Sequence, residues 1–316
     1  MLTLWARGAD GARYAVPDPV AVEVTWGMDS PAHSMELSFL RQGPPLPPLV
    51  EAELHSGEQV LFRGFCDQQR EESGPGGRSL QISARSRGGL LLDNEAQPKT
   101  YFRADTGDIF RAHVLPYGIT RLEVPRVLSA GLFEVQKGRS EWEVFCAFCM
   151  RMYGRLPWLD SRDGVRVAAP DRTPAAVVSN DPARPGALRY QSLCRTLRRS
   201  SVVSRIVIRD RDGNYSSAME TRQKDLGVQR RRFIIPAAEY ATTPTADAFQ
   251  RLQRSSLGFY SLGAVLPGLA PVELGDAVLV ADPLCGQRVL TVYQRILCRD
   301  ARGLQTRLTL ADPEYL

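Results

Sequence analysis

The sequence predicts a mainly β protein of the α+β class, with a β region, then a unit of helices and strands, then a second β region. Two observations carry this prediction. Short runs in which apolar and polar residues alternate, the pattern of half-buried strands, fill both ends of the chain. Helix start and stop signals concentrate near the middle. With 316 residues, the chain is long enough for two or three domains.

The first hundred residues consist of strand patterns separated by turns rich in Gly, Ser and Pro. MLTLWA and RYAVP flank a turn at residues 7–11 and predict a hairpin. In SMELSFL, Met35, Leu37 and Phe39 alternate with polar residues. Further strands are expected in AVEVTW, VEAELH, EQVLFRGFCD and SLQISAR. Many short strands at near-regular spacing indicate a small barrel or sandwich.

The middle of the chain carries two helix signals. We expect Thr106 to cap a short helix that ends near Gly118. Ser140 and Glu143 form a capping-box pattern, and the helix that follows should stop at Gly154. The apolar stripe of this second helix is Trp142, Phe145, Cys146, Cys149 and Met152. A hairpin with its turn at residues 161–164 completes the predicted α+β unit.

The last third begins with one helix and ends in strands. Thr243 and Pro244 form a start signal, and Phe249 and Leu252 are expected on the buried side of the helix. Residues 276–282, 287–300 and 303–312 then predict a β-meander. One face of the middle strand should carry Leu290, Val292, Ile296 and Cys298, and the polar residue Gln294 interrupts this apolar face. The last strand should place on one face Leu304, Thr306, Leu308 and Leu310.

The composition is that of an ordinary soluble protein, with 43% hydrophobic and 24% charged residues and a mean hydropathy of −0.23. No apolar run approaches the roughly 18 residues that span a bilayer, and no signal peptide precedes the first strand, so we expect no membrane insertion by the chain itself. The chain is expected to stay in a cytosol unless a larger assembly carries it out. Its six cysteines are expected to be reduced and mostly buried.

The formal net charge is +5, and much of the excess lies in residues 195–212 and 229–232. A basic excess suits nucleic acid, an anionic surface or an acidic partner. No nucleic-acid-binding motif accompanies either segment. A nucleic-acid-binding β-barrel protein therefore remains an alternative function.

The sequence offers little catalytic chemistry. His33, His55 and His113 lie far apart in three predicted elements, and no HExxH or GxSxG motif occurs. Cys146 and Cys149 form a CxxC pair that has no second pair to complete a zinc site. Because both fall on the predicted apolar stripe, buried structural thiols are the better interpretation.

Metal and nucleotide motifs are also weak. In DRDGNY, Asp210, Asp212 and Asn214 have the spacing of a calcium loop, but glycine stands at position four and Thr221 replaces the required glutamate. An ordinary hairpin turn is the better interpretation. No Walker loop and no GxGxxG motif occurs. We therefore expect no catalytic residues, no cofactor and no metal, in a protein that is not an enzyme.

The stretch ISARSRGGLLLDNEA, residues 82–96, resembles a segment of baseplate hub proteins of contractile-tailed, Mu-like phages. Arg85, Ser86, Leu91 and Asp93 match the family's positions without a gap. Ala84 replaces the usual glycine, and leucine stands at residue 90, where the family commonly has an aspartate.

The resemblance extends over nearly the whole chain. It covers AVEVTWGMDSPAHSMELSF, VLFRGFCD, SEWEVFCAFCMRMYGRLPWLDSRDGVRV, RTLRRSSVVSRIVIR and the closing residues 272–316. The tryptophans that the family carries before the closing meander are absent, and LGAVLPGLAP stands there. The chain also resembles the hub-like part of type VI secretion spikes.

This resemblance implies two small β-barrel domains of hub type with an inserted α+β unit. The expected division is residues 1–95 for the first barrel, 96–185 for the inserted unit, 186–240 for strands returning to the first barrel and a linker, and 241–316 for a helix and the second barrel. Three such chains would form a ring of six quasi-equivalent barrels joining a six-fold tail tube to a three-fold spike.

The implied partners are a homotrimer, a central spike protein, a tail tube or tube-initiator protein, baseplate wedge proteins and a tape measure protein, with DNA only in transit. The implied location is the tail baseplate of a virion assembled in the bacterial cytoplasm. Arg85, Arg87, Leu91 and Asp93 are the candidate structural or interface residues. The leucines would fill either a barrel end, an interface or an internal core. A spike-associated peptidoglycan hydrolase is the enzymatic alternative.

Overall fold

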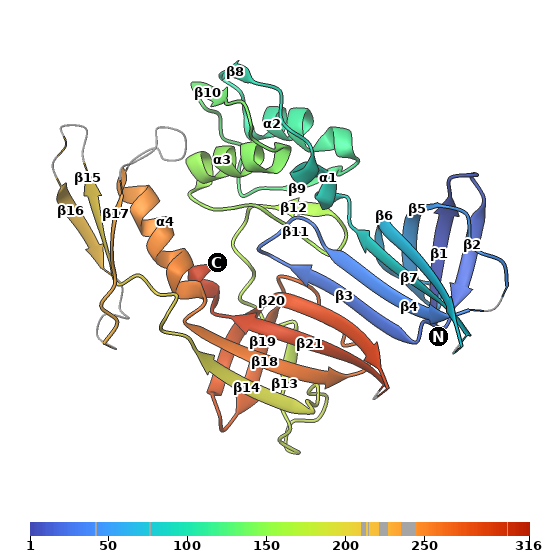
Figure 1. Ribbon diagram of the computed structural model, residues 1–316. Helices are drawn as coiled ribbons and strands as arrows, with labels where there is room; N and C mark the ends of the chain where they lie inside the picture. Colours follow the sequence, from blue (N-terminus) through green and yellow to red (C-terminus); the bar gives the residue numbers. More distant parts are fainter. Residues whose placement is uncertain are drawn as a thin grey trace.

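The computed structural model describes residues 1–41, 43–75, 77–209, 213, 215–220, 227–234, 244–301 and 303–316. Its elements form two units of strands, one compact unit of helices and short strands, and a small lobe that projects from the body (Figure 1). A 13-stranded sheet runs through both strand units. The predicted mainly β class is confirmed.

The first unit contains the strands predicted in the first hundred residues. They are β1 (Leu2–Gly8), β2 (Arg13–Pro17), β3 (Ala21–Gly27), β4 (Ser34–Leu40), β5 (Leu49–Ser56), β6 (Gln59–Gly74) and β7 (Gly77–Arg85). Their order in the sheet is β3-β4-β7-β6-β5-β1-β2. Met35, Leu37 and Phe39 point inward from β4, as predicted, and are buried with Trp26 and Leu54 in one core.

The inserted unit follows directly. It consists of α1 (Gly88–Asp93), β8 (Lys99–Phe102), α2 (Thr106–His113), a 3₁₀ turn (Leu115–Tyr117), β9 (Arg121–Glu123), β10 (Leu132–Val135), α3 (Glu141–Tyr153), β11 (Trp158–Leu159) and β12 (Gly164–Arg166). β8 pairs with β10, and β12 lies between β11 and β9. The rings of Phe110 on α2 and Phe145 on α3 meet edge to face, 6.2 Å apart, in a separate core.

Helix α3 has the predicted ends. The capping box of Ser140 and Glu143 is present, and Gly154 ends the helix with a φ of 64°. Of the predicted apolar stripe, Trp142, Phe145 and Cys149 are buried, whereas Cys146 and Met152 are partly buried.

The predicted N-cap of α2 is wrong by one residue. Asp105 accepts a hydrogen bond from the Asp108 backbone, and the Asp108 carboxylate accepts one from the Asp105 backbone. The Thr106 hydroxyl instead donates to the carbonyl oxygen of Leu128 at 3.2 Å. A carboxylate box therefore starts this helix, while the threonine ties it to a loop.

The second unit consists of β13 (Ala176–Val178), β14 (Ser192–Leu197), β18 (Tyr260–Pro267), β19 (Ala277–Asp282), β20 (Gly286–Asp300) and β21 (Gly303–Ala311), and a 3₁₀ turn (Pro313–Tyr315) follows. The order is β14-β18-β21-β20, with β19 beside β20 and β13 beside β19. The prediction that strands in residues 186–240 return to the first barrel is wrong, because β14 pairs with β18. β13, expected in the inserted unit, also pairs here.

The lobe lies between β14 and β18 in the sequence. It contains β15 (Arg205–Arg209), β16 (Tyr215–Glu220), β17 (Arg231–Ile234) and α4 (Pro244–Leu257). Ile206, Ile208, Ala248 and Leu252 form its small core. The prediction for Phe249 is wrong: its side chain is 46% exposed, and Ala248 takes the buried position. The predicted cap at Thr243 and the loop residues Asp210, Asp212, Asn214 and Thr221 lie outside the described residues.

Five strands of the first unit recur in the second unit with the same pairing pattern. β3, β4, β5, β6 and β7 correspond to β14, β18, β19, β20 and β21, in the same chain order and with the same neighbours. The tight turn between Gly74 and Gly77 corresponds to that between Asp300 and Gly303. Each long strand, β6 or β20, pairs with β5 or β19 only before its bulge, and with β7 or β21 from two residues before the bulge onward.

The prediction that Ile296 and Cys298 share a face with Leu290 and Val292 is wrong, because β20 contains a bulge. The register shifts between Val292 and Gln294. Leu290 and Val292 therefore point into the core of the second unit, whereas Leu297 points into the core of the first. One strand thus contributes to two cores. β21 buries Thr306, Leu308 and Leu310 on the predicted face.

After its bulge β20 also pairs with β3, which joins the two units into one sheet. Among the described strands, no pairing closes either unit into a barrel. All six cysteines are free, but only Cys149 and Cys298 are buried, which is fewer than predicted. Within the described ranges, no helix has the length and apolar character needed to span a bilayer.

Candidate functional site

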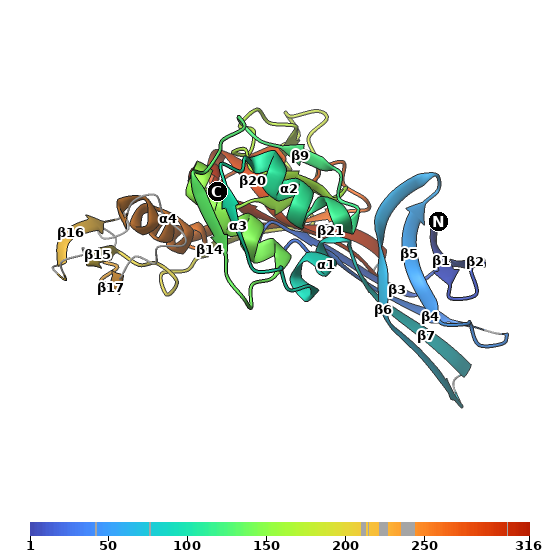
Figure 2. The same ribbon diagram turned by 90° about the horizontal axis from the view of Figure 1, so that it is seen from above.

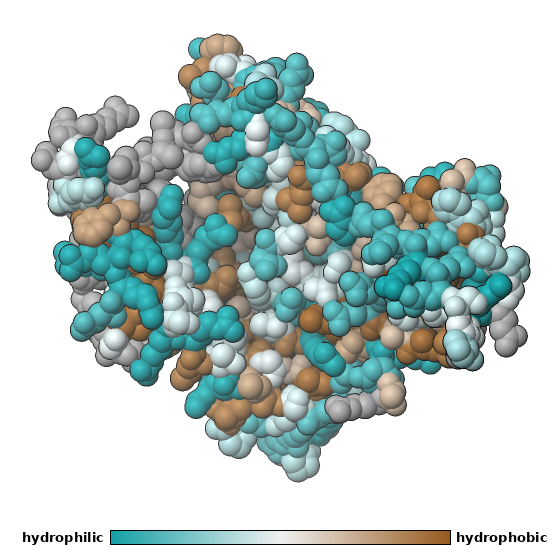
Figure 3. All heavy atoms as spheres, viewed as in Figure 1, coloured by the Kyte–Doolittle hydropathy of each residue, from teal (hydrophilic) through white to brown (hydrophobic). Residues whose placement is uncertain are grey.

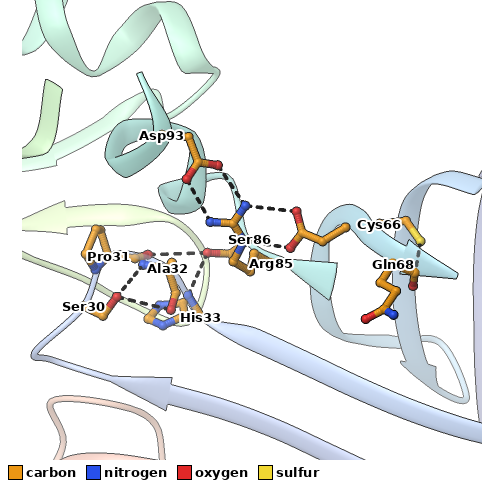
Figure 4. A network of polar contacts seen from close by, with 10 residues as sticks. Ser30, Pro31, Ala32, His33, Cys66, Gln68, Arg85, Ser86 and Asp93 are labelled. Carbon is orange, nitrogen blue, oxygen red and sulfur yellow. Dashed lines mark hydrogen bonds and ion pairs between the residues drawn. The ribbon is translucent and has the colours of Figure 1, made fainter. Parts of the chain in front are cut away.

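The candidate residues lie where the chain leaves the first strand unit and enters the inserted unit. We call residues 85–93 the junction. The Arg85 guanidinium, at the end of β7, donates to both carboxylate oxygens of Asp67 at 2.7 and 3.0 Å. It also donates to both oxygens of Asp93, the last residue of α1, at 3.1 and 2.8 Å (Figure 4). One planar side chain therefore clamps β6 to α1.

The clamp has the electrostatics of a charge-assisted network. Hydrogen bonds from Arg85 lower the pKa of Asp93, and the two carboxylates raise the pKa of Arg85. The three side chains keep between 37% and 47% of their surface exposed. Because water screens such pairs, the clamp orients α1 more than it stabilises the whole fold.

The serine and glycines of the junction allow close contact with the β3–β4 loop. Ser86 exchanges hydrogen bonds with the His33 backbone at 2.8 and 3.1 Å (Figure 4). A Cβ on Gly88 would lie 2.0 Å from the carbonyl oxygen of Pro31, so only glycine fits there. The His33 ring reaches the carbonyl oxygen of Asp160 in the inserted unit at 3.1 Å. Burial lowers the pKa of His33, so a neutral ring makes this contact.

Arg87 contacts other residues than Arg85 does. Its guanidinium lies 5.9 Å from the centre of the Phe65 ring and packs against Gly118. It lines a cavity of about 550 Å³ that also borders Asp163 and Arg295. Desolvation raises the pKa of Asp163 to about 6.

Leu91 is fully buried in the core of the inserted unit, with Phe145 and Leu159. It does not belong to the core of the first strand unit. Leu92, the next residue, is 40% exposed. The structure thus brings Arg85 and Asp93 together, and it places Arg87 and Leu91 in two different environments on either side of them.

A second connection was not predicted from the sequence. Arg295 on β20 is 4% exposed, stacks 4.8 Å from the Trp26 ring of β3, and donates to Glu273 at 2.8 Å. Glu273 also accepts a hydrogen bond from Ser161 of the inserted unit at 2.7 Å. Three units therefore meet at one ion pair, in which Arg295 is buried and the Glu273 side chain is 40% exposed. Its only signal in the sequence is an arginine within an apolar strand.

Two further groups of polar residues make contacts that stabilise the inserted unit and show no arrangement typical of a catalytic site. His113 contacts Glu141 at 2.5 Å and Tyr101 at 3.0 Å, but both His113 and Glu141 are buried, and neither lines a described cavity. In the groove of about 860 Å³ beside β12, Asp160 accepts hydrogen bonds from Arg121 and Arg166. Among the described residues, no cluster of His, Cys, Asp and Glu could hold a metal ion.

Several solved structures have a similar fold. A tail protein from Neisseria meningitidis MC58 matches with a TM-score of 0.79 and 17% identity, covering 98% of this chain and 96% of that chain. The 43 kDa tail protein of prophage MuSo2 from Shewanella oneidensis matches with a TM-score of 0.81 and 13% identity, covering 100% and 99%. This chain has the fold of phage tail proteins.

A component of the type VI secretion system of E. coli also matches, with a TM-score of 0.56 and 10% identity, covering 93% of this chain and 73% of that chain. The resemblance to phage hub and type VI secretion proteins noted in the sequence is therefore confirmed at the level of the fold. No protein-family model and no curated protein matches the sequence. No comparison indicates a catalytic family.

Proposed function

We propose that this chain is a structural baseplate hub of a contractile phage tail or phage-like particle, and not an enzyme. Three copies would form a ring in which each five-stranded unit, closed by its neighbours, provides one of six quasi-equivalent β-barrels. The ring would join a six-fold tail tube to a three-fold spike. Closed rings with head-to-tail interfaces are a common way to build such symmetry.

The observation that carries this proposal is the repeat of five strands within one chain. The repeat preserves chain order, neighbours, turn length and bulge position. A chain with two equivalent units and three-fold assembly presents six similar surfaces to a six-fold partner and three to a three-fold partner. The full-length likeness to phage tail proteins supports the same role.

In this role the junction transmits force. The Arg85 clamp, the contacts of Ser86 and the ion pair of Arg295 fix the inserted unit against both strand units. The central spike, the tail tube or tube initiator, the wedge proteins and the tape measure protein would then dock on a rigid frame. Assembly would take place in the bacterial cytoplasm, and the finished hub would lie in the virion baseplate.

Light scattering tests the proposal. The solution mass of the purified chain would be measured alone and mixed with the spike protein of the same particle. A mass near three times 35.0 kDa in either condition is expected. A strict monomer in both conditions would reject the hub.

The charge and the exposed aromatic rings of the lobe support nucleic-acid binding as a second candidate function. Residues 195–232 carry eleven basic and four acidic residues, a net charge of +7 against +5 for the whole chain. Tyr215 and Phe233 are 51% and 59% exposed on the sheet of the lobe, with ring centres 5.3 Å apart. Exposed aromatic rings among arginines suit base stacking. Binding of a labelled oligonucleotide that salt abolishes and that Phe233→Ala weakens would favour this function; no binding at low salt would reject it.

A further inference from the structure

The 13-stranded sheet has an unpaired backbone edge on its terminal strand β2, and two further unpaired edges, on β14 and on part of β6, lie far apart in the molecule. β14 is the terminal strand of the second unit and pairs only with β18. Past its bulge, β6 pairs only with β7, so residues 68–74 have one free edge within the described part of the chain. Figures 1 and 2 both place β14 and the β6–β7 hairpin far apart, so they do not meet within one copy.

These two edges correspond to two edges that already pair inside the chain. β14 corresponds to β3, and the second half of β6 corresponds to the second half of β20. Inside the chain β20 and β3 pair antiparallel, with Cys298 opposite Glu23 and Leu297 opposite Val24. The free edge of β14 therefore corresponds to the β3 side of this pairing, and the free edge of β6 corresponds to the β20 side.

The registers of the strand pairs show which residues of β6 and β14 correspond to which residues of β20 and β3. Both long strands have a bulge that skips one residue, Asp67 or Tyr293. Counting from there, Glu72 corresponds to Cys298. Glu23 corresponds to Cys194, because each lies in the third position of its strand.

We propose that β14 of one copy pairs antiparallel with residues 68–73 of β6 in the next copy, repeating the β3–β20 contact between chains. The register places Cys194 opposite Glu72, Arg195 opposite Glu71 and Thr196 opposite Arg70. This proposal rests on the proposed ring and names the contact that closes it. Each chain then continues the sheet of its neighbour head to tail, which leaves neither of these two edges unpaired once the ring closes.

The side chains at the two edges complement each other. Glu71 and Arg195 carry opposite charges, and opposite charges in directly facing cross-strand positions are favourable. β14 has no fully buried side chain, and Leu197 is 51% exposed on it, opposite Gln69 in the proposed register. Hydrophilic side chains spread over the right-hand part of the face seen in Figure 3, where Figure 1 places β5 and β6. The β6 edge thus carries Glu71 and Glu72, and the β14 edge carries Arg195 and the exposed Leu197.

Disulfide cross-linking tests the register. Directly facing residues have Cα atoms roughly 4.5–5.5 Å apart, within the range a disulfide allows. Glu72→Cys should therefore form a disulfide with Cys194 of the next copy under oxidised glutathione, giving products of two and three chains on a non-reducing gel. Glu71→Cys, whose side chain points to the other face, should stay a single chain. Adding Cys194→Ser to the Glu72→Cys variant should abolish the cross-link.

A positive control lies inside the chain. Glu23→Cys places a thiol opposite Cys298 in the corresponding register and should give an intrachain disulfide, seen as a change in mobility without larger products. Charge reversal gives an independent measurement. Glu71→Arg should weaken self-association roughly tenfold, and adding Arg195→Glu should restore it.

The outcomes separate this inference from the function on which it rests. A three-chain mass without the cross-link in Glu72→Cys, while the Glu23→Cys control forms its disulfide, overturns the strand pairing and leaves the ring standing. A monomer at every concentration, with and without the spike, overturns both. Cross-linked products of two and three chains together with charge rescue support the pairing.

Discussion

Replacing Leu91 by Ala should destabilise the inserted unit without disturbing the strand units. Leu91 is 0% exposed and belongs to the core that α1, α2 and α3 share. The change removes three buried carbon atoms, which costs about 2.4 kcal/mol at about 0.8 kcal/mol per buried methylene. The cavity left behind raises the expected loss to about 3 kcal/mol.

Amide hydrogen exchange measures this loss unit by unit. The opening free energy of amides in α3 should fall by about 3 kcal/mol, while amides in β7 and β18 should change little. Leu92→Ala is the matched control, because Leu92 is 40% exposed and should cost less than about 1 kcal/mol. Equal effects of the two substitutions, or a change confined to β7, would refute the assignment of Leu91 to the core of the inserted unit.

Three further tests probe the junction and its surroundings. In a double-mutant cycle of Arg85→Gln and Asp93→Asn, urea unfolding should give a coupling free energy of about 1 kcal/mol between the two side chains, because the pair is bidentate but partly exposed. Additive effects of the two substitutions on the free energy of unfolding would contradict the clamp. Burial raises the pKa of Asp163 to about 6, so the folded state binds this proton more tightly than the unfolded state, and the stability of the wild-type protein should fall as pH rises from about 4 to 6. The Asp163→Asn variant cannot bind this proton, so its melting curves should lack that part of the fall. Identical pH dependence in the two proteins would contradict the raised pKa. Gly88→Ala should lower the melting temperature by several degrees, since its Cβ would lie 2.0 Å from a backbone carbonyl, whereas Gly89→Ala, whose Cβ meets only side-chain atoms at 3.3 Å or more, should have little effect.

Local patterns predicted the elements because local forces set them. The alternation around Met35 specified β4, and the serine–glutamate box specified α3, since both depend only on residues a few positions apart. Asp105 was missed as the cap of α2 because Asp and Thr both cap helices, and only the position of Leu128 shows which side chain is free to do so.

The sequence singled out Arg85 and Asp93 because they lie eight residues apart in one motif, and the structure brings the two side chains together. The sequence did not predict that Leu91 enters another core, or that Arg295 pairs with Glu273 beneath Trp26. The position of Asp67 as the second partner of Arg85 depends on the pairing of β6 with β7.

By itself the sequence determined that this protein is mainly β, where most strands and helices begin and end, and which family it resembles. Only the tertiary structure decided that β14 pairs with β18, that β20 contributes to two cores, and that the two units share one sheet. The physical reason is that the alternation of side chains along a strand shows which of its faces is apolar, but does not show which other strand it will pair with. Edge pairing joins backbone groups that every residue carries, so the choice of partner depends on the packing of the whole chain.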